Sequence, residues 1–343
     1  MVVGTNITAT AFNTQLRNGT PADLAQSFIT SNLNNHPTVA SPNNTPFVNF
    51  YANPAIGQIE YFTNAGEYNY NALQLELRRR FSQGVYFQAN YTLSKNLTNA
   101  AGTTQGLFEP NLQNERPELE YTRADYDQRH AFNFNGIVQL PFGKGRKFLN
   151  QGGIVDAIFG GFELAGLAQW ASGAPITFID NRGTLNRGVR SGRQTPNSSL
   201  TGNEIQNLIG IFHQNGNVYY INPSVIDPVT GRASNGYINP ANSNTTFEGQ
   251  VFFSVPEGQT GNLPRAIVNG PRNHRVNMSL LKNIRFTESV RVQLRAEAFN
   301  VFNKTVFRHP TSQFVNIASA TFGQITSTAV DARQMQFAFR FEF

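Results

Sequence analysis

The chain ends on the stretch Met335-Gln336-Phe337-Ala338-Phe339-Arg340-Phe341-Glu342-Phe343. Large apolar residues occupy every second position of this stretch, and polar or small residues occupy the positions between them. Side chains of a β-strand alternate between its two faces, so one face of this strand is apolar and the other is largely polar. The pattern predicts a strand that separates lipid from water, which is typical of a membrane-spanning β-barrel rather than an enzyme.

The composition of the 343-residue chain also favours an outer-membrane barrel. Only 14% of the residues are Asp, Glu, Lys or Arg, against roughly 25% in ordinary soluble domains. The chain contains 29 phenylalanines, although Gly, Asn, Thr and Ser keep it polar on average. This balance fits strands in which one residue in two faces lipid. No run approaches the ~18 apolar residues of a transmembrane helix, so a helical membrane protein is excluded.

The cysteine content and the distribution of charge exclude further classes of function. The chain has no cysteine, which excludes a disulfide framework and any Cys-based metal or redox site. The net charge is +6, but the basic residues are scattered, and the run Arg78-Arg79-Arg80 lies at a strand end beside a turn. We therefore expect no nucleic-acid partner.

A clear hairpin is predicted over residues 68–93. Three leucines within residues 73–77 share one face and polar side chains share the other, and Ser82-Gln83-Gly84 forms the tight turn. The same alternation predicts further strands over residues 130–140, 162–179, 275–286, 290–298 and 335–343. We also expect a short helix near residues 154–159 and a local hairpin within residues 247–255.

The connections between these strands alternate in length. Short connections lie at residues 82–84 and 287–289, with an intermediate one at residues 142–161, whereas long loops cover residues 94–129, 180–272 and 303–331. Outer-membrane barrels have short periplasmic turns and longer extracellular loops. We therefore predict an all-β fold, an antiparallel transmembrane β-barrel segment of about seven to eight strands that forms a partial barrel with long extracellular loops. Residues 1–67 are assigned to a strand stub and an extracellular loop, and residues 68–343 to the C-terminal part of the barrel.

The strand over residues 290–298 separates the barrel hypothesis from a soluble alternative. Its polar face carries Arg291, Gln293, Arg295 and Glu297. Four such side chains are hard to bury in the dry core of a soluble β-sandwich, for example a carbohydrate-binding module, whereas a water-filled barrel interior accepts them.

Candidate catalytic and metal-binding residues are few. The histidines lack metal-ligand spacing. Asp125 and Asp127 are close enough for acid–base work, but they lie among Arg123, Arg129 and His130, which favours a charge-paired rim. The segment Gly143–Lys147 is basic and glycine-rich but lacks phosphate-loop spacing. We therefore expect no catalytic, cofactor-binding or metal site, and no enzyme activity. The five histidines are His36, His130, His213, His274 and His309.

A set of short motifs follows in order from about residue 56 to the end of the chain. They are Tyr70-Asn71-Ala72-Leu73-Gln74, Arg80-Phe81-Ser82-Gln83-Gly84, Tyr91-Thr92-Leu93-Ser94-Lys95, Asp125-Tyr126-Asp127-Gln128-Arg129-His130, Leu140-Pro141-Phe142-Gly143-Lys144-Gly145, Gly258-Gln259-Thr260-Gly261-Asn262, Gly270-Pro271-Arg272 and Arg295-Ala296-Glu297-Ala298-Phe299-Asn300-Val301-Phe302-Asn303. Together they resemble the C-terminal barrel of TonB-dependent outer-membrane receptors, closest to the Oar-like type with an N-terminal carboxypeptidase-regulatory-like domain.

The resemblance implies a 22-stranded barrel that is filled by a plug and energised by a periplasmic coupling protein. The chain departs from that pattern, because it has room for about seven strands and a stub and shows no plug, coupling motif or signal peptide. We therefore expect the last third of a receptor in the outer membrane of a Gram-negative-type bacterium. The parent would take up a scarce nutrient such as a siderophore, glycan or peptide. The alternative is a self-contained small barrel that acts as an adhesin or structural protein.

The terminal strand also resembles the signal that the β-barrel insertion machinery recognises. Phe343 is the last residue, with Phe341, Phe339 and Phe337 behind it. These phenylalanines are expected both to face lipid and to serve as the outer-membrane assembly signal. The expected partners are therefore outer-membrane lipid, the insertion machinery and, through the rest of the parent, the periplasmic energy-coupling protein.

Overall fold

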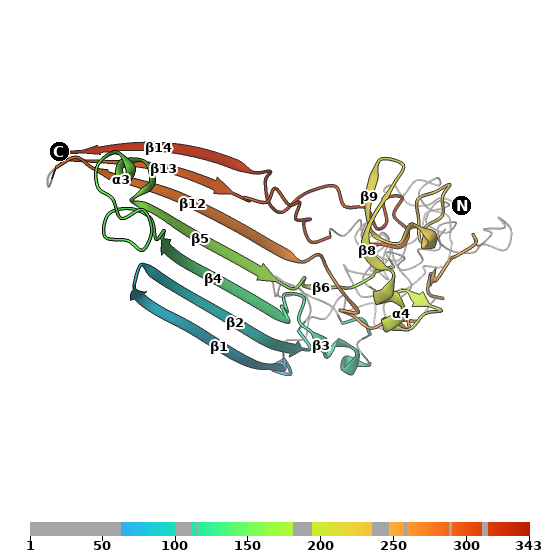
Figure 1. The fold of residues 1–343 in the computed structure, drawn as a ribbon. Coiled ribbons are helices and arrows are strands. Elements are labelled where there is room, and N and C mark those ends of the chain that lie inside the picture. The colour runs from blue at the N-terminus through green and yellow to red at the C-terminus, as the bar shows by residue number, and fades with distance from the viewer. Residues whose placement is uncertain are drawn as a thin grey trace, which may run out of the picture.

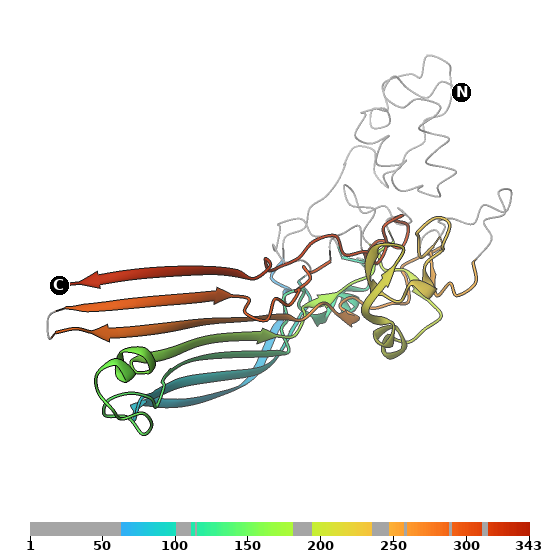
Figure 2. The same cartoon turned by 45° about the horizontal axis from the view of Figure 1, so that its top comes forward.

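A computed structural model describes residues 63–100, 111–113, 115–180, 194–234, 247–256, 259–287, 290–310 and 315–343. It consists of a long curved sheet and a smaller lobe at one end of that sheet (Figures 1 and 2). The sheet is an antiparallel meander in which each long strand pairs with the next along the chain. Its long strands are β1 (Tyr68–Ser82), β2 (Val85–Thr98), β4 (His130–Gln139), β5 (Phe162–Ala171), β12 (Asn273–Arg285), β13 (Arg291–Phe299) and β14 (Gln334–Glu342). The two-residue strand β3 (Thr122–Arg123) adds to β2.

The register aligns the apolar residues of every long strand on one face of the sheet. Directly paired residues lie on the same face of a sheet. Phe339 pairs with Leu294, which pairs with Lys282, and Lys282 pairs with Phe162 of β5. The apolar face continues through Phe132, Phe134, Tyr91 and Phe87 to the leucines Leu73, Leu75 and Leu77 of β1. We call this the apolar face and the opposite one the polar face.

The alternate side chains of each strand point to the polar face. It includes Arg295 and Arg340 at one edge, and Glu76 and Arg78 at the other. The alternation that each strand shows in the sequence is therefore shared by the whole sheet, as a wall between lipid and water requires.

Within the described part of the chain, both edges of the sheet are unpaired. No described strand pairs with the outer edge of β1 or of β14, and every residue of β1 is exposed. The chain passes seven times along the sheet, so β1 and β14 run in the same direction. Because barrels of this kind are antiparallel throughout, these two strands cannot close against each other.

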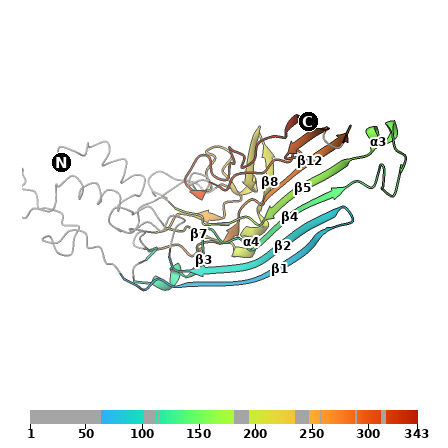
Figure 3. The ribbon, with the colours of Figure 1, turned by 90° about the vertical axis from the view of Figure 1, so that its left-hand side faces the viewer.

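All short connections lie at the end of the sheet that holds the C-terminus (Figure 3). They include the turn at Gln83–Gly84, where both residues have positive φ, and the segment with α3 (Ile154–Phe159). The turn, α3 and the hairpin between β12 and β13 confirm the sequence predictions.

The lobe lies at the opposite end and is built mainly from the segment between β5 and β12. Its hairpin is β8 (Ile209–Gln214) with β9 (Asn217–Ile221), preceded by α4 (Gly202–Asn207). Two other pairs of short strands bring distant segments together. They are β6 (Pro175–Ile176) with β11 (Val268–Asn269), and β7 (Asn197–Ser198) with β10 (Phe252–Phe253). Single turns η1 (Pro117–Glu120) and η3 (Pro223–Val225) complete the described elements.

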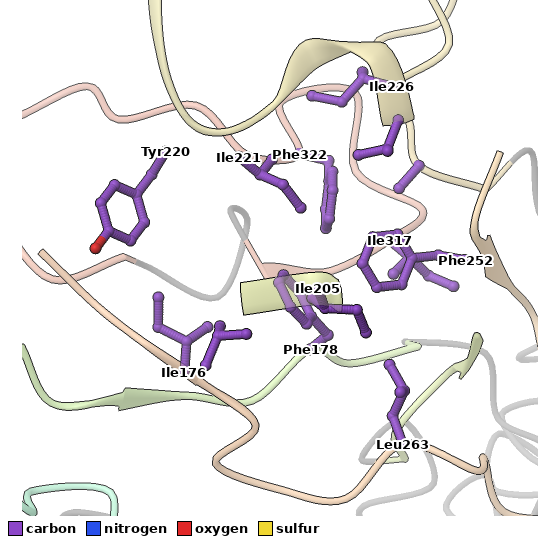
Figure 4. Close-up of a cluster of buried hydrophobic side chains, with 13 residues drawn as sticks. Ile176, Phe178, Ile205, Tyr220, Ile221, Ile226, Phe252, Leu263, Ile317 and Phe322 are labelled. Carbon is purple, nitrogen blue, oxygen red and sulfur yellow. The ribbon is translucent and has the colours of Figure 1, made fainter. Parts of the chain in front are cut away.

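A hydrophobic core of its own stabilises the lobe (Figure 4). Phe178, Phe252 and Phe322 are almost fully buried, and their ring centroids are 5.0–5.8 Å apart. Ile317 and Phe322 come from the connection between β13 and β14, so two loops share one core. The residues of this core are Ile176, Phe178, Ile205, Tyr220, Ile221, Val225, Ile226, Ala233, Phe252, Leu263, Val268, Ile317 and Phe322.

Two predictions from the sequence were wrong in detail. The strand predicted over residues 162–179 is interrupted after Ala171 and resumes only at Pro175–Ile176. In the gap the chain passes so close to the facing segment that a Cβ on Gly173 would lie 1.9 Å from the carbonyl oxygen of Gly270. The hairpin predicted within residues 247–255 does not form, since Phe252 pairs with Ser198 instead. Local alternation cannot identify a partner more than fifty residues away.

Candidate functional site

Hydrogen bonds between neighbouring strands cover the polar face of the sheet. Each links an amide or guanidinium group on one strand to an oxygen acceptor on the next. Such a ladder satisfies polar groups along the wall while leaving them open to water. The pairs are Gln88 to Glu76 (3.3 Å), Gln139 to Glu163 (3.3 Å), Gln293 to Asn283 (3.0 Å), Arg291 to Glu342 and Gln336 to Glu297.

The apolar face has no described layer over its terminal strand. The exposed fractions of Phe337, Phe339, Phe341 and Phe343 are 76%, 67%, 51% and 93%. Exposing a row of large aromatic side chains to water is unfavourable, by about 25 cal/mol for each Å² of apolar surface, whereas lipid solvates them. The structure thus places the four phenylalanines where the sequence predicted a lipid-facing wall. Their recognition by the insertion machinery stays a prediction.

Two cations lie on the apolar face near the end with the short turns. Lys282 donates from Nζ to the carbonyl oxygen of Ile158 at 3.2 Å and also to that of Gly160, and its Nζ lies 4.6 Å from the ring centroid of Phe162. Arg79 donates to the carbonyl oxygen of Ser82 at 3.3 Å. Both charges thus reach backbone carbonyls at the rim, as long cationic side chains do at a membrane interface.

A cavity of about 880 Å³ lies between the end of the sheet and the lobe. Asn273, which the register places on the polar face next to Ala171, lines it, and so does Tyr126. Burial raises the pKa of the Tyr126 hydroxyl, and the nearby Tyr68 of the polar face raises it further. The cavity therefore opens on the side of the polar face. Its volume is in the range of small-molecule sites, and we call it the inner cavity.

A buried ion cluster forms one wall of the inner cavity. Arg265 lies 2.6 Å from Glu120 and 3.3 Å from Asp125, and the side chains of Arg265 and Glu120 are only 9% and 2% exposed. Glu120 also accepts a hydrogen bond from the backbone N–H of Leu112. Because one cation shares two carboxylates, this cluster fastens the segment that follows β2 to the segment that precedes β12.

Asp125 and Asp127 form ion pairs, as the sequence predicted. Asp127 is buried, accepts from Arg123 at 2.9 Å and from the backbone N–H of Asn96 at 2.9 Å, while Asp125 faces Arg265. The sequence did not point to Arg265 or Glu120, because they are 145 residues apart and neither lies in a motif. Only the fold brings them together.

The described histidines are spread over the structure. His130 is hydrogen-bonded through Nδ1 to the hydroxyl of Tyr91 at 2.8 Å, and His309 contacts the carbonyl oxygen of Pro175 at 3.2 Å. His213 lies on β8 and His274 on β12, and His36 lies outside the described residues. Within the described part of the chain, no three His, Asp or Glu residues are grouped so that they could hold a metal ion.

The basic segment Gly143–Lys147 is a turn at the end of the sheet that holds the C-terminus. The backbone N–H of Lys144 donates to Asp156 at 2.7 Å, and that of Gly145 donates to Asn150. These donors are therefore used within the turn, as predicted for a connection and not for a phosphate cradle.

No helix in the described ranges is both long enough and apolar enough to span a membrane. A family model described as an outer membrane beta barrel domain matches residues 4–336. The curated proteins and the solved structures contain no significant match to the chain.

Proposed function

Since the chain belongs to the outer membrane beta barrel domain family and is located in the outer membrane, we propose that it forms the C-terminal part of the barrel of a TonB-dependent receptor of the Oar-like type. The parent receptor would take up a scarce nutrient such as a siderophore, glycan or peptide. Its partners would be outer-membrane lipid, the insertion machinery and a periplasmic energy-coupling protein that acts on the rest of the receptor.

The observation that carries this proposal is the direction of the two edge strands. β1 and β14 run the same way, and no described strand pairs with either edge. Closing the barrel therefore requires an odd number of further strands, since neighbours in these barrels are antiparallel. A large receptor barrel supplies such strands. A long, unpaired, apolar edge would otherwise aggregate.

The inner cavity supports a role in ligand entry. It lies on the polar side of the sheet at the lobe end, and its lining combines the ion cluster with apolar side chains such as Phe307 and Val315. The loops that form it also share the core of the lobe, which gives the cavity fixed walls. We propose that it holds part of the nutrient before transport, and that the chain has no enzyme activity and takes no cofactor.

A small closed barrel is the alternative. It would need one strand from the first 62 residues between β1 and β14, and would act as an adhesin or a structural protein. In that case the polar-face residues Glu76 and Arg340 would be two strand spacings apart, which is roughly 10 Å. In a large receptor they would be much farther apart.

Thiol cross-linking distinguishes these two barrels, because the chain has no cysteine of its own. The variant with Glu76→Cys and Arg340→Cys is treated in outer membranes with a bismaleimide that spans about two strand spacings. We expect no intramolecular product. The control variant combines Gln293→Cys with Arg340→Cys, which are direct partners in the register, and should cross-link. Efficient cross-linking of the first pair would establish the small barrel and refute the receptor.

Uptake is tested in cells that lack the gene and in cells that carry variants. Cells that lack the gene should fail to grow on at least one scarce nutrient from a panel of siderophore-bound iron, glycans and peptides. In cells that carry the native gene, a proton uncoupler should abolish uptake of that nutrient. Ala329→Trp, at an exposed residue lining the inner cavity, should lower uptake, whereas Val229→Trp, at a lobe residue that is 89% exposed, should not. Unchanged growth of the deletion strain on the whole panel would contradict uptake.

A further inference from the structure

A second cavity, of about 990 Å³, lies at the lobe end of the sheet on the other side of the wall. The two cavities share Ser172, Gly173, Pro271 and Phe307, so they adjoin at the segment that joins β5 to β6. Asn273 lines the inner cavity and its neighbour His274 lines the second one. Successive residues of a strand point to opposite faces. The second cavity therefore opens on the apolar face, and we call it the outer cavity.

Cations dominate the lining of the outer cavity. Lys95, Arg123, Arg129 and Arg272 all line it, and none of the described residues that line it is an Asp or a Glu. Lys95, Arg129 and Arg272 are exposed and have no ion pair within the described part of the chain. Four positive charges on the lipid side of a membrane wall are costly unless an anion compensates them.

Arg123 shows that this charge is only partly compensated by the protein. The register pairs it with Leu97, two residues beyond Lys95. Its Nε bonds Asp127 at 2.9 Å and its Nη1 donates to Asn269 at 2.8 Å. Its Nη2 is buried and has no hydrogen-bond partner among the described residues. A buried donor without a partner costs about 1–3 kcal/mol, which an anionic ligand would recover.

Aromatic residues place the outer cavity at the depth of lipid headgroups. Trp170 lines it, and the ring centroid of Trp170 lies 6.2 Å from that of His130, which in turn contacts Tyr91. Trp and Tyr gather at the boundary between hydrocarbon and headgroups. From this level, Phe132 and Phe134 continue the apolar face toward the middle of the sheet.

Tyr220 supplies a neutral group at the lobe side of the outer cavity. Burial raises the pKa of its hydroxyl to about 12, although the nearby Arg272 lowers it. The hydroxyl donates to the carbonyl oxygen of Asn269 at 3.2 Å. It therefore adds no negative charge that would compete with an anion for Arg272.

We propose that the outer cavity binds the phosphate-bearing headgroup of an outer-leaflet lipid. Guanidinium groups recognise phosphate through paired, charge-assisted hydrogen bonds, and basic pockets at the membrane surface bind anionic headgroups. The acyl chains of this lipid would lie along Trp170, Phe132 and Phe134. The inference requires only that the apolar face contacts lipid, so it does not depend on nutrient uptake.

The test uses the protein extracted from outer membranes in mild detergent. It is titrated with diphosphoryl lipid A, with the same lipid after removal of its phosphates, and with inorganic phosphate, and bound molecules are counted by native mass spectrometry. We expect one saturable site for diphosphoryl lipid A. The variant with Arg129→Gln and Arg272→Gln should bind it about ten-fold more weakly, because two charge-assisted contacts are lost.

A charge-matched control separates the site from the overall charge. Arg78→Gln with Arg275→Gln also removes two positive charges, but these residues lie on the polar face, so affinity should change by less than about two-fold. Should the first variant fail to fold, Lys95→Gln, at an exposed residue, should weaken binding about three-fold. The proposal is overturned by equal affinity for the dephosphorylated lipid, equal affinity for inorganic phosphate, equal loss in the control variant, or no binding to the native protein.

Discussion

Replacing Arg265 by methionine is expected to loosen the segment that follows β2 by about two orders of magnitude. Arg265→Met removes the cation from the cluster and leaves the carboxylate of Glu120, which is 2% exposed, without its charge partner. Breaking a buried ion pair by removing one member costs about 3–5 kcal/mol. A loss of about 3 kcal/mol corresponds to roughly a hundred-fold increase in the population of the open segment, since 1.4 kcal/mol is a factor of ten.

Hydrogen exchange measures this opening, because local unfolding exposes amides that are otherwise protected. The reporter is the backbone N–H of Ala124, which donates to the carbonyl oxygen of Asn96 at 3.0 Å. Its exchange should become about a hundred-fold faster in Arg265→Met. The matched control is Arg116→Met, which breaks the exposed pair of Arg116 with Glu118 (3.1 Å, side chains 54% and 64% exposed), where less than about 1 kcal/mol is at stake.

A second substitution tests the cause of the loss. Adding Glu120→Gln to Arg265→Met removes the uncompensated charge but keeps an oxygen acceptor for the backbone N–H of Leu112. Much of the protection should then return, since a buried neutral amide costs less than a buried charge. The reasoning is refuted if Arg265→Met changes the exchange of Ala124 by less than about three-fold, or if Arg116→Met accelerates it as much.

Three further changes probe the wall, the close approach of Gly173 to Gly270, and the lobe. Phe339→Arg should destabilise the barrel in vesicles by about 2–4 kcal/mol toward urea, as cations do at mid-membrane, and an equal effect of Ala338→Arg on the polar face would contradict the assignment of faces. Gly173→Ala should lower the free energy of unfolding by about 1–3 kcal/mol through overpacking, because its Cβ would meet the backbone of Gly270, whereas Gly166→Ala meets nothing within 4 Å and should be neutral in the same assay. Thr201→Ala removes the capping box of α4 and should reduce the exchange protection of this helix by about 1 kcal/mol. In the native protein, the hydrogen bond from the backbone of Thr201 lowers the pKa of Glu204 below its ordinary value of 4.5. The contribution of the Glu204 carboxylate to the stability of α4 is therefore present above pH 4.5 and lost as the pH falls further. Exchange protection of α4 that is independent of pH between 7 and 3 would contradict this.

The strands of the wall could be predicted from the sequence because the information in them is local. Apolar and polar residues that alternate with a period of two show which face of a strand is apolar. A tight turn such as Ser82-Gln83-Gly84 shows that the strands on its two sides pair as a hairpin. Both strands of the first hairpin, the strands predicted over residues 130–140, 275–286, 290–298 and 335–343, and the helix at Ile154–Phe159 therefore appear where expected. The wet face with Arg291, Gln293, Arg295 and Glu297 was predicted for the same reason.

The lobe and both cavities could not be predicted in this way. The contacts that build them join residues far apart in the sequence, such as Arg265 with Glu120, Phe252 with Ser198, and Gly173 with Gly270. No periodic pattern records such a contact, because each partner satisfies the other only after the chain has folded.

The sequence by itself thus determined that each strand has an apolar face and a polar face, since the two faces follow from the alternation of neighbouring residues on one strand. Only the tertiary structure decided that the faces of all seven long strands align, that the edge strands β1 and β14 run in the same direction, and that cations from separate segments meet on the lipid side. The physical reason is that register, direction and clustering depend on how distant segments pair, and pairing is settled by the packing of the whole chain.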